Sequence, residues 1–226
     1  GLVSNGGVHS HINHLKGLLS AAKENGLDNQ VFVHAFTDGR DTDPKSGYAF
    51  VENVEAHLKT SVGKIATVSG RYYAMDRDKR WERVQKAYQL LTQGKGSKVT
   101  SAVEALEQSY ANGITDEFLE AHLIDSAGTI VEGDVVICFN FRTDRPREIT
   151  TVLTQQAFPE YQMNPMDLYY CTMTNVRSFP QCHSYSREHM YRTILLHITA
   201  IFYHYATPVA TYRCARPHIY IFTYYH

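Results

Sequence analysis

The sequence predicts an α/β protein with a mostly parallel sheet flanked by helices. Three apolar runs rich in β-forming residues lie at 31–37, 64–70 and 134–141, and stretches with apolar residues at helical spacing separate them. Strands that alternate with helices form βαβ units, whose strands are parallel. A chain of 226 residues, of which 43% are hydrophobic and 20% charged, can bury such a core.

Helix signals surround the first strand. Apolar residues at helical spacing predict a helix over 12–22, and Gly26 is its predicted stop. Ser46 is the predicted N-cap of the helix after the first strand, whose apolar face runs from Phe50 to Leu58.

Two further signals mark the starts of later helices. Ser101 and Glu104 have the spacing of a capping box, and Pro146 stands at a position that the first helical turn tolerates. The remaining predicted elements are, in order, a helix over 81–91, a helix after Ser101, the strand at 134–141, a helix over 146–156 and a strand at 167–173.

The composition changes sharply near residue 175. Up to Asn175 the chain carries 17 Lys or Arg and 22 Asp or Glu, whereas 176–226 holds five Arg, one Glu and no Lys, Asp or Gly, with eight Tyr and six His. We therefore expect a domain over 1–175, incomplete at its N-terminus, and an aberrant or disordered tail over 176–226. A shifted reading frame or alternative splicing would produce such a tail.

The composition disfavours several classes of protein. A formal net charge of −1 argues against wholesale nucleic-acid binding. The first residues lack the basic and apolar regions of a signal peptide, and no run of 18 apolar residues could span a membrane. Four cysteines without paired spacing predict no disulfide framework, so Cys138 and Cys171 are expected to be free, buried thiols in a reducing, cytoplasmic setting.

Charged side chains follow the strands, where parallel sheets collect their ligands. Arginine's planar fork matches the oxygens of carboxylates and phosphates, and gathering several arginines without an anion would cost repulsion. The simpler alternative is that each arginine pairs with a nearby aspartate, for which Asp41, Asp76, Asp78 and Asp144 are available. The predicted anion-binding arginines are Arg40, Arg71, Arg77, Arg142 and Arg145.

Two further residues are candidates for the same site. His9 follows the glycine-rich loop of the first residues, and a histidine can bind phosphate or shuttle a proton. Asp41, beside Arg40, could accept a hydroxyl proton or simply orient Arg40. His11 and His14 match no standard zinc spacing and are expected on the first helix, so no metal site is predicted in this chain.

Five motifs in order carry a resemblance to a known family. They are GLVSNGGVHSH, HAFTDGRDTDP, SGRYYAMDRDKRW, SAVEALEQSYANGITDEF and FNFRTDRPREI. Together they resemble the cofactor-independent, or 2,3-bisphosphoglycerate-independent, phosphoglycerate mutases over residues 1–175.

The resemblance implies a function and a division of labour. The family interconverts 3-phosphoglycerate and 2-phosphoglycerate in glycolysis without 2,3-bisphosphoglycerate. One lobe carries two manganese ions and the serine that becomes phosphorylated, and an inserted lobe binds the substrate. This chain resembles the inserted lobe, in which His9, Arg40, Asp41, Arg71, Arg77, Arg142 and Arg145 would contact phosphoglycerate, with Asp41 exchanging a proton.

The resemblance also implies limits. The serine and the metal ligands have no counterpart here, so we expect this chain alone to be inactive. The intact enzyme is expected to be monomeric.

A second hypothesis is a non-catalytic anion- or nucleic-acid-binding module whose contact surface is the basic, aromatic tail.

Overall fold

The computed structural model describes residues 1–27 and 30–174, and the backbone of Cys182–Ser184. The tail predicted over 176–226, and the nucleic-acid hypothesis that depends on it, therefore lie outside the described residues, apart from that backbone. No helix in the described ranges is long and apolar enough to cross a membrane.

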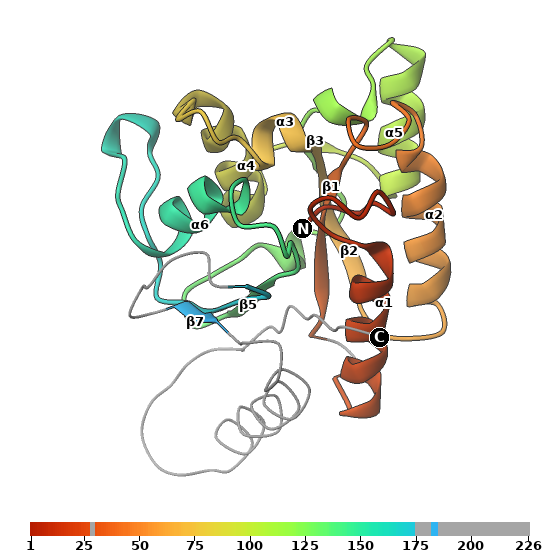
Figure 1. The fold of residues 1–226 in the computed structure, drawn as a ribbon, viewed down its shortest axis with the longest axis horizontal. Helices are drawn as coiled ribbons and strands as arrows, with labels where there is room; N and C mark the ends of the chain where they lie inside the picture. Colours follow the sequence, from red (N-terminus) through yellow and green to blue (C-terminus); the bar gives the residue numbers. More distant parts are fainter. Residues whose placement is uncertain (28–29, 175–181, 185–226) are drawn as a thin grey trace.

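Two sheets form the framework (Figure 1). In the first, β1 (Phe32–Thr37) and β2 (Lys64–Gly70) are parallel, and the short β4 (His122–Leu123) pairs antiparallel with β2 and parallel with β3 (Ser97–Lys98).

The second sheet is entirely parallel. It consists of β5 (Val135–Cys138), β6 (Tyr169–Thr172) and β7 (Cys182–Ser184), the last from the segment predicted as a tail. The predicted α/β class with parallel strands is thus confirmed. The division into two sheets and the antiparallel pair at β4 were not predicted, because a two-residue strand has no readable pattern.

The longer helices lie where the sequence predicts them, whereas the four-residue α3 was not predicted. Ser101 caps its helix as predicted, since its Oγ accepts a hydrogen bond from the Glu104 amide at 3.1 Å. The helices are α1 (Ile12–Glu24), α2 (Gly47–Leu58), α3 (Arg71–Ala74), α4 (Trp81–Gln93), α5 (Ala102–Ala111) and α6 (Pro146–Thr154), with short 3₁₀ helices η1 (Asp116–Phe118), η2 (Ser126–Gly128) and η3 (Pro159–Tyr161).

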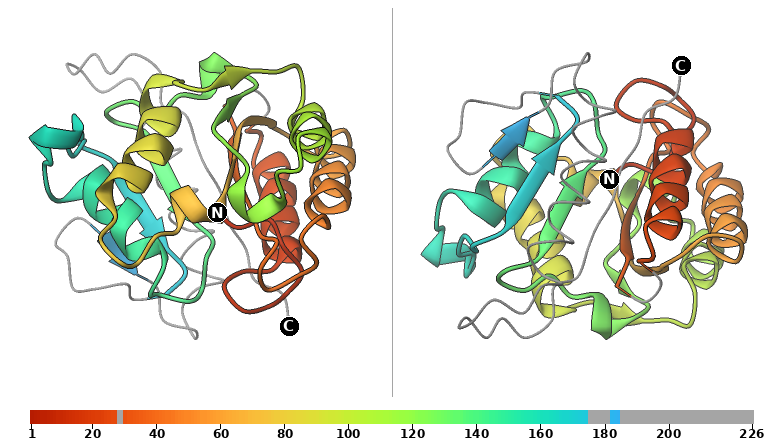
Figure 2. Two further views of the ribbon diagram at one scale, coloured as in Figure 1. Left: turned by 90° about the horizontal axis from the view of Figure 1, so that it is seen from above. Right: turned by 90° about the horizontal axis from the view of Figure 1, so that it is seen from below.

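The first sheet lies between α1, α2 and α5 on one side and α4, α6 and the second sheet on the other (Figure 2), and an apolar core fills the space on each side. On β1, Val33 and Ala35 belong to the core beneath α1, α2 and α5, whereas Phe32 and Phe36 belong to the core shared with α4, α6 and the second sheet. This division follows from the alternation of side chains along a strand. Burial on both faces makes β1 and β2 rigid supports for the loops at their ends.

The prediction that Ser46 caps α2 was wrong. Ser46 occupies the N-cap position, but its hydroxyl bonds to Thr42 and to the Asp43 carbonyl. The first helical amide, of Gly47, instead donates to Asp116 at 2.7 Å. A side chain 69 residues away therefore serves as the cap.

Cys138 is a free thiol, as predicted. Cys138 is buried, and Cys171 is only half-buried. Cys171 lies on β6, where side chains alternate between faces, and this accounts for its partial exposure.

Candidate anion-binding site

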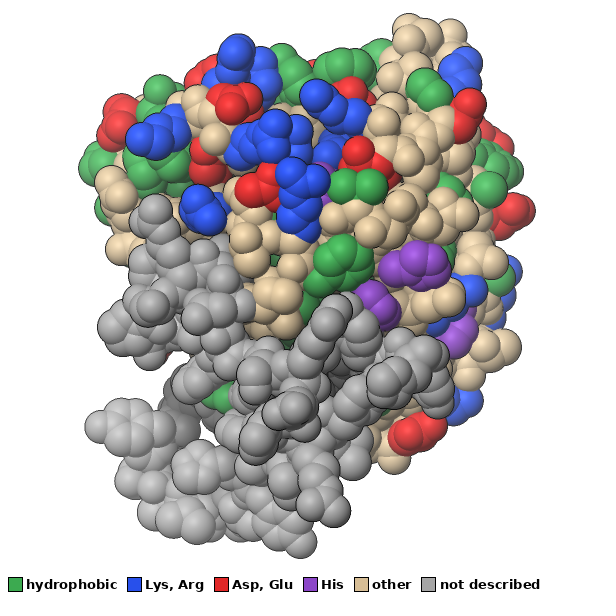
Figure 3. Space-filling model, in the orientation of Figure 1, with side chains coloured by type: hydrophobic (Ala, Val, Ile, Leu, Met, Phe, Trp, Pro, Cys, Tyr) green, Lys and Arg blue, Asp and Glu red, His purple; other side chains and the backbone are tan. Residues whose placement is uncertain are grey.

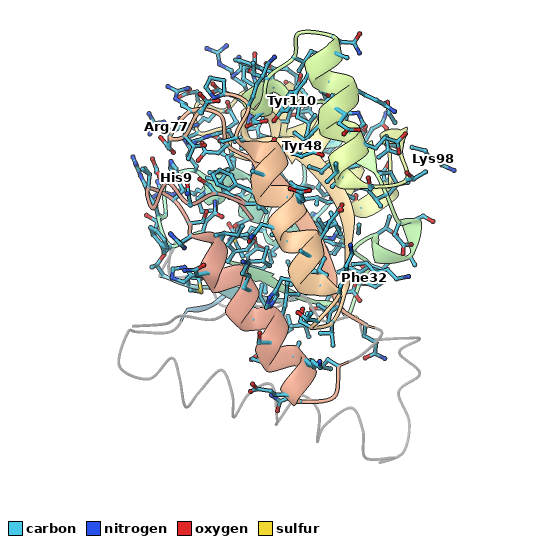
Figure 4. The ribbon with its side chains drawn as sticks, turned by 90° about the vertical axis from the view of Figure 1, so that its right-hand side faces the viewer. His9, Phe32, Tyr48, Arg77, Lys98 and Tyr110 are labelled. Atoms are coloured by element: carbon cyan, nitrogen blue, oxygen red, sulfur yellow. The ribbon has the colours of Figure 1, made fainter. Side chains whose placement is uncertain are left out.

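The loops after β1, β2 and β5 meet the N-terminal loop at one end of the molecule. Figure 3 shows Lys and Arg side chains gathered there, with acidic side chains between them, in the upper half of the view. Figure 4 shows His9 and Arg77 on the same side of the molecule. The backbone joins the loops too, since the Phe141 amide donates to the His9 carbonyl at 2.8 Å.

Arg71 is the buried centre of this region. Its side chain is 2% exposed, and its Nη1 lies 2.6 Å from Asp38 Oδ1 and 2.5 Å from Asp41 Oδ2. A guanidinium removed from water needs such partners, because an unpaired buried charge is very costly. Arg71 therefore joins the end of β2 to the loop after β1.

Asp38 organises the loop after β1. Its carboxylate accepts hydrogen bonds from the Ser4 hydroxyl at 2.6 Å and from the amides of Arg40 and Asp41. Burial alone would raise the pKa of Asp38, but the bonds from Ser4, Asp41 and Arg71 outweigh it and hold the pKa below its ordinary value. Asp38 thus stays ionised and fixes the position of Asp41.

His9 lies between two carboxylates without forming a close bond to either. Its Nε2 is 3.7 Å from Asp41 Oδ2, and its Nδ1 is 3.8 Å from Asp144 Oδ1. Burial, followed by the charge of Arg71, lowers the pKa of His9 to about 4 despite the two aspartates. His9 is therefore neutral at neutral pH, and its Nδ1 has no hydrogen-bond partner.

Asp144 forms ion pairs with Arg77 and Arg142, which are the most exposed of the predicted arginines after Arg40. Arg77 Nη1 lies 2.8 Å from its Oδ2, and Arg142 Nε lies 2.9 Å from its Oδ1. Burial alone would raise the pKa of Asp144. The bond from Arg77 and the charge of Arg142 outweigh burial and hold the pKa below its ordinary value. These pairs link the loop after α3 to the loop after β5.

Arg40 and Arg145 have weaker attachments. Arg40 is 55% exposed and lies 3.2 Å from Glu117, while Arg145 donates to the Met75 carbonyl at 3.0 Å. Arg145 Nε is buried without a partner. Burial and the charges of Arg71, Arg77 and Arg40 lower the pKa of Arg145, so added negative charge here would be stabilising.

A polar hollow of about 240 Å³ opens between these arginines. Its volume is enough for a small organic anion, and its walls supply charge and aromatic surface. The lining residues are Arg40, Arg71, Tyr72, Asp76, Arg77, Asp78, Arg83, Glu117, Phe118 and Arg145. Such a site would bind an anion bearing more than one negative group, because the guanidinium forks approach it from several sides.

Of the seven residues predicted from the sequence, Arg40, Arg71, Arg77 and Arg145 line the hollow. His9, Asp41 and Arg142 do not line it and lie beside it, next to Arg71 and Asp144. The simpler alternative also holds in part: Arg71, Arg77 and Arg142 each pair with an aspartate, while Arg40 pairs with Glu117 and Arg145 with a carbonyl. The structure thus contains both ion pairs and a shared hollow.

Three residues that contribute to the site were not predicted from the sequence. Asp38 is the first residue after β1, and that position alone could have indicated it. Glu117 lies in the quoted motif ending TDEF, but its contact with Arg40 spans 77 residues. Arg83 lies on α4, 3.8 Å from the Tyr72 ring and 3.5 Å from Asp76, and no sequence signal marked it.

The described residues do not fit a metal centre. No three His, Cys, Asp or Glu side chains within 1–27 and 30–174 group closely enough to hold an ion. His11 accepts a hydrogen bond at the start of α1, and His14 is buried edge-on against Phe141. Both lie on or at the first helix, as expected.

Residues 1–178 are similar to a known protein family. The model of the family described as "BPG-independent PGAM N-terminus (iPGM_N)" matches residues 1–178. The 2,3-bisphosphoglycerate-independent phosphoglycerate mutase of Flavobacterium johnsoniae is 55% identical over 77% of this chain, and that of Bacteroides thetaiotaomicron is 52% identical over 86% of it. The second match therefore extends past Asn175.

The structural comparison gives the same result. A crystal structure of Leishmania mexicana phosphoglycerate mutase at low cobalt concentration superposes with a TM-score of 0.70 and 30% identity, over 76% of this chain and 34% of that one. The chain spans 35% and 39% of the length of the two bacterial relatives. With the family model matching most of its length, the chain belongs to the BPG-independent phosphoglycerate mutase family, whose N-terminal domain it contains.

Proposed function

We propose that residues 1–175 are the substrate-binding lobe of a 2,3-bisphosphoglycerate-independent phosphoglycerate mutase, which interconverts 3-phosphoglycerate and 2-phosphoglycerate in glycolysis. One observation carries this proposal: arginines from three separate loops surround a single hollow. The phosphoglycerate-binding residues would be His9, Arg40, Asp41, Arg71, Arg77, Arg142 and Arg145.

The chemistry of the substrate suits these side chains. Phosphoglycerate carries a carboxylate and a phosphate, and arginine binds both through paired hydrogen bonds. Neutral His9 can donate to or accept from a substrate oxygen without adding charge. The partly unsatisfied Arg145 would gain the partner that its buried Nε lacks.

Asp41 is the proposed acid–base residue. Arg71 holds its carboxylate at 2.5 Å, and the Asp41 side chain is still 21% exposed. It could accept the proton of the glycerate hydroxyl while that oxygen takes up the phosphoryl group, and return it in the reverse direction. Arg71 would keep the carboxylate oriented throughout.

The covalent step would take place on another lobe. We propose that a phosphorylated serine and two manganese ions, which supply the nucleophile and charge neutralisation, belong to that lobe. The described residues would bind and reorient the glycerate. The intact enzyme would be a monomer in the cytoplasm, a location with which the free thiol of Cys138 is compatible.

Calorimetric titration of this chain with 3-phosphoglycerate tests the proposal. We expect saturable binding that weakens with salt, a loss of about tenfold or more in Arg77→Ala, and no mutase turnover with manganese by this chain alone. Arg147→Ala is the matched control, because Arg147 is an exposed arginine on α6, two residues beyond Arg145. Equal affinity in both variants, or no binding to the wild type, would refute the site.

A further inference from the structure

Asp116 lies behind the site loop rather than in the hollow. It is 0% exposed and belongs to η1, the short helix between α5 and β4. Asp116 does not line the hollow, although its neighbour Glu117 does. Its position raises the question of why a carboxylate is buried there.

The carboxylate binds two elements at once. Its Oδ2 accepts the Gly47 amide at 2.7 Å, and its Oδ1 accepts the Tyr110 hydroxyl from α5. Figure 4 shows Tyr48 and Tyr110 close together near the start of α2, and the Tyr48 amide donates to the Tyr110 hydroxyl at 3.3 Å. The start of α2 is thus attached to Asp116 directly and through Tyr110.

The backbone of Asp116 fixes both ends of the same loop. Its carbonyl accepts the Thr37 hydroxyl at 2.6 Å where β1 ends, and its amide donates to the Pro44 carbonyl at 3.0 Å. The loop between these points carries Asp38, Arg40 and Asp41. Three hydrogen bonds, with Thr37, Pro44 and Gly47, therefore connect one buried residue to both ends of the loop.

The close approach also depends on glycines. A Cβ on Gly39 would lie 2.8 Å from Asp116 Cβ, and one on Gly47 would lie 2.7 Å from Asp116 Oδ1. At Gly70, just before Arg71, a Cβ would lie 2.2 Å from the Glu117 carbonyl oxygen. Loops after both β1 and β2 are therefore packed against the 116–117 backbone.

We propose that Asp116 is a positioning residue that sets the conformation of the 38–46 loop, and through it the placement of Arg40 and Asp41. The effect on ligand affinity rests on the proposed function, whereas the effect on the loop does not. Asp116 acts through Gly47, Pro44 and Tyr110 and needs no contact with the ligand.

Hydrogen–deuterium exchange on the full chain tests the structural part. In Asp116→Asn, one oxygen acceptor is replaced by a donor, and we expect amide exchange over 38–47 to accelerate about tenfold or more. Tyr110→Phe removes a single hydroxyl and should give a smaller increase in the same segment. Ser101→Ala is the control, since it removes a cap from α5 without touching the 38–46 loop.

Titration with 3-phosphoglycerate tests the functional part. We expect affinity to fall about threefold or more in Asp116→Asn and to be unchanged in Ser101→Ala. Unchanged exchange over 38–47 in both Asp116→Asn and Tyr110→Phe would overturn the proposal. Accelerated exchange over 38–47 with an unchanged affinity for 3-phosphoglycerate would overturn it too. A wild-type chain that binds no phosphoglycerate would refute the proposed function, while the exchange data would still decide the role in the loop.

Discussion

The loop after β1 and the loop after α3 both carry arginines to the hollow, but they are held in different ways. Residues 38–46 are held locally by Asp38, which accepts the amides of Arg40 and Asp41, and at a distance by Ser4, Arg71 and Asp116. Residues 75–80 are held chiefly by Asp76, which accepts the amides of Asp78 and Arg80 at 2.9 and 3.0 Å. Both loops contain an aspartate that closes on its own backbone, but Asp116 additionally attaches both ends of the first loop to a distant part of the fold.

The difference shows how rigidity can be achieved in two ways. Asp76 forms a local turn of a kind that aspartate often forms, closing on its own backbone. The one distant bond to that loop's backbone amides comes from Glu148, which accepts the Lys79 amide at 2.8 Å. The 38–46 loop instead requires that β1, α5 and η1 have already packed. We expect the two loops to respond to different mutations.

The largest effect should come from Arg71→Ala, because Arg71 connects the end of β2 to the loop after β1. Its removal leaves Asp38 and Asp41 without their buried cation, and we expect a loss of about 3–5 kcal/mol in the free energy of unfolding. Urea denaturation measures this loss. Arg142→Ala, a 45% exposed ion pair, should cost about 1 kcal/mol or less. Similar losses in Arg71→Ala and Arg142→Ala would show that Arg71 does not hold the end of β2 to the loop after β1.

Asp76→Ala should have a smaller and more local effect. It removes acceptors for two amides and a partner of Arg83, and we expect a loss of about 1–3 kcal/mol. Amide exchange should accelerate over 75–80 and stay unchanged over 38–47, the reverse of Asp116→Asn. Acceleration in both segments would mean that the two loops are coupled.

The smallest effect should be a pH dependence traced to Asp116. Burial raises the pKa of Asp116 to about 6, although Tyr110 and Gly47 donate to it, and the nearby Asp38 and Asp43 add to the rise. Between the ordinary carboxyl pKa and about 6, the folded state holds the proton that the unfolded state has released. Stability contributed by this group therefore falls as the pH rises through that interval and is level above it.

Asp38 and Asp144 have lowered pKa values, so the stability that they contribute rises with pH. Both residues are present in Asp116→Asn as well, so comparison of the wild type with this variant isolates the contribution of Asp116. Urea midpoints at pH 4.5 and pH 6.5 should show that the wild type loses stability relative to Asp116→Asn as the pH rises. A constant difference between the two proteins would mean that Asp116 does not titrate in this interval.

Much of the site could be read from the sequence, but its connections could not. Arg40, Arg71 and Arg77 follow strands of a predicted parallel sheet, so their convergence was foreseeable. Their partners were not, since Glu117 lies 77 residues from Arg40 and Asp144 lies 67 from Arg77. The boundary at residue 175 remains a prediction, and the match to the Bacteroides thetaiotaomicron relative, which covers 86% of this chain, extends past it.

The sequence by itself determined the order of the longer helices and strands and the capping of α5 by Ser101, because these depend on local periodicity and on bonds within one turn. Only the tertiary structure decided that His9 is neutral, that Asp116 caps α2, and that β4 runs antiparallel to β2. Each of these depends on burial or on contacts between distant segments, which the path of the folded chain alone creates.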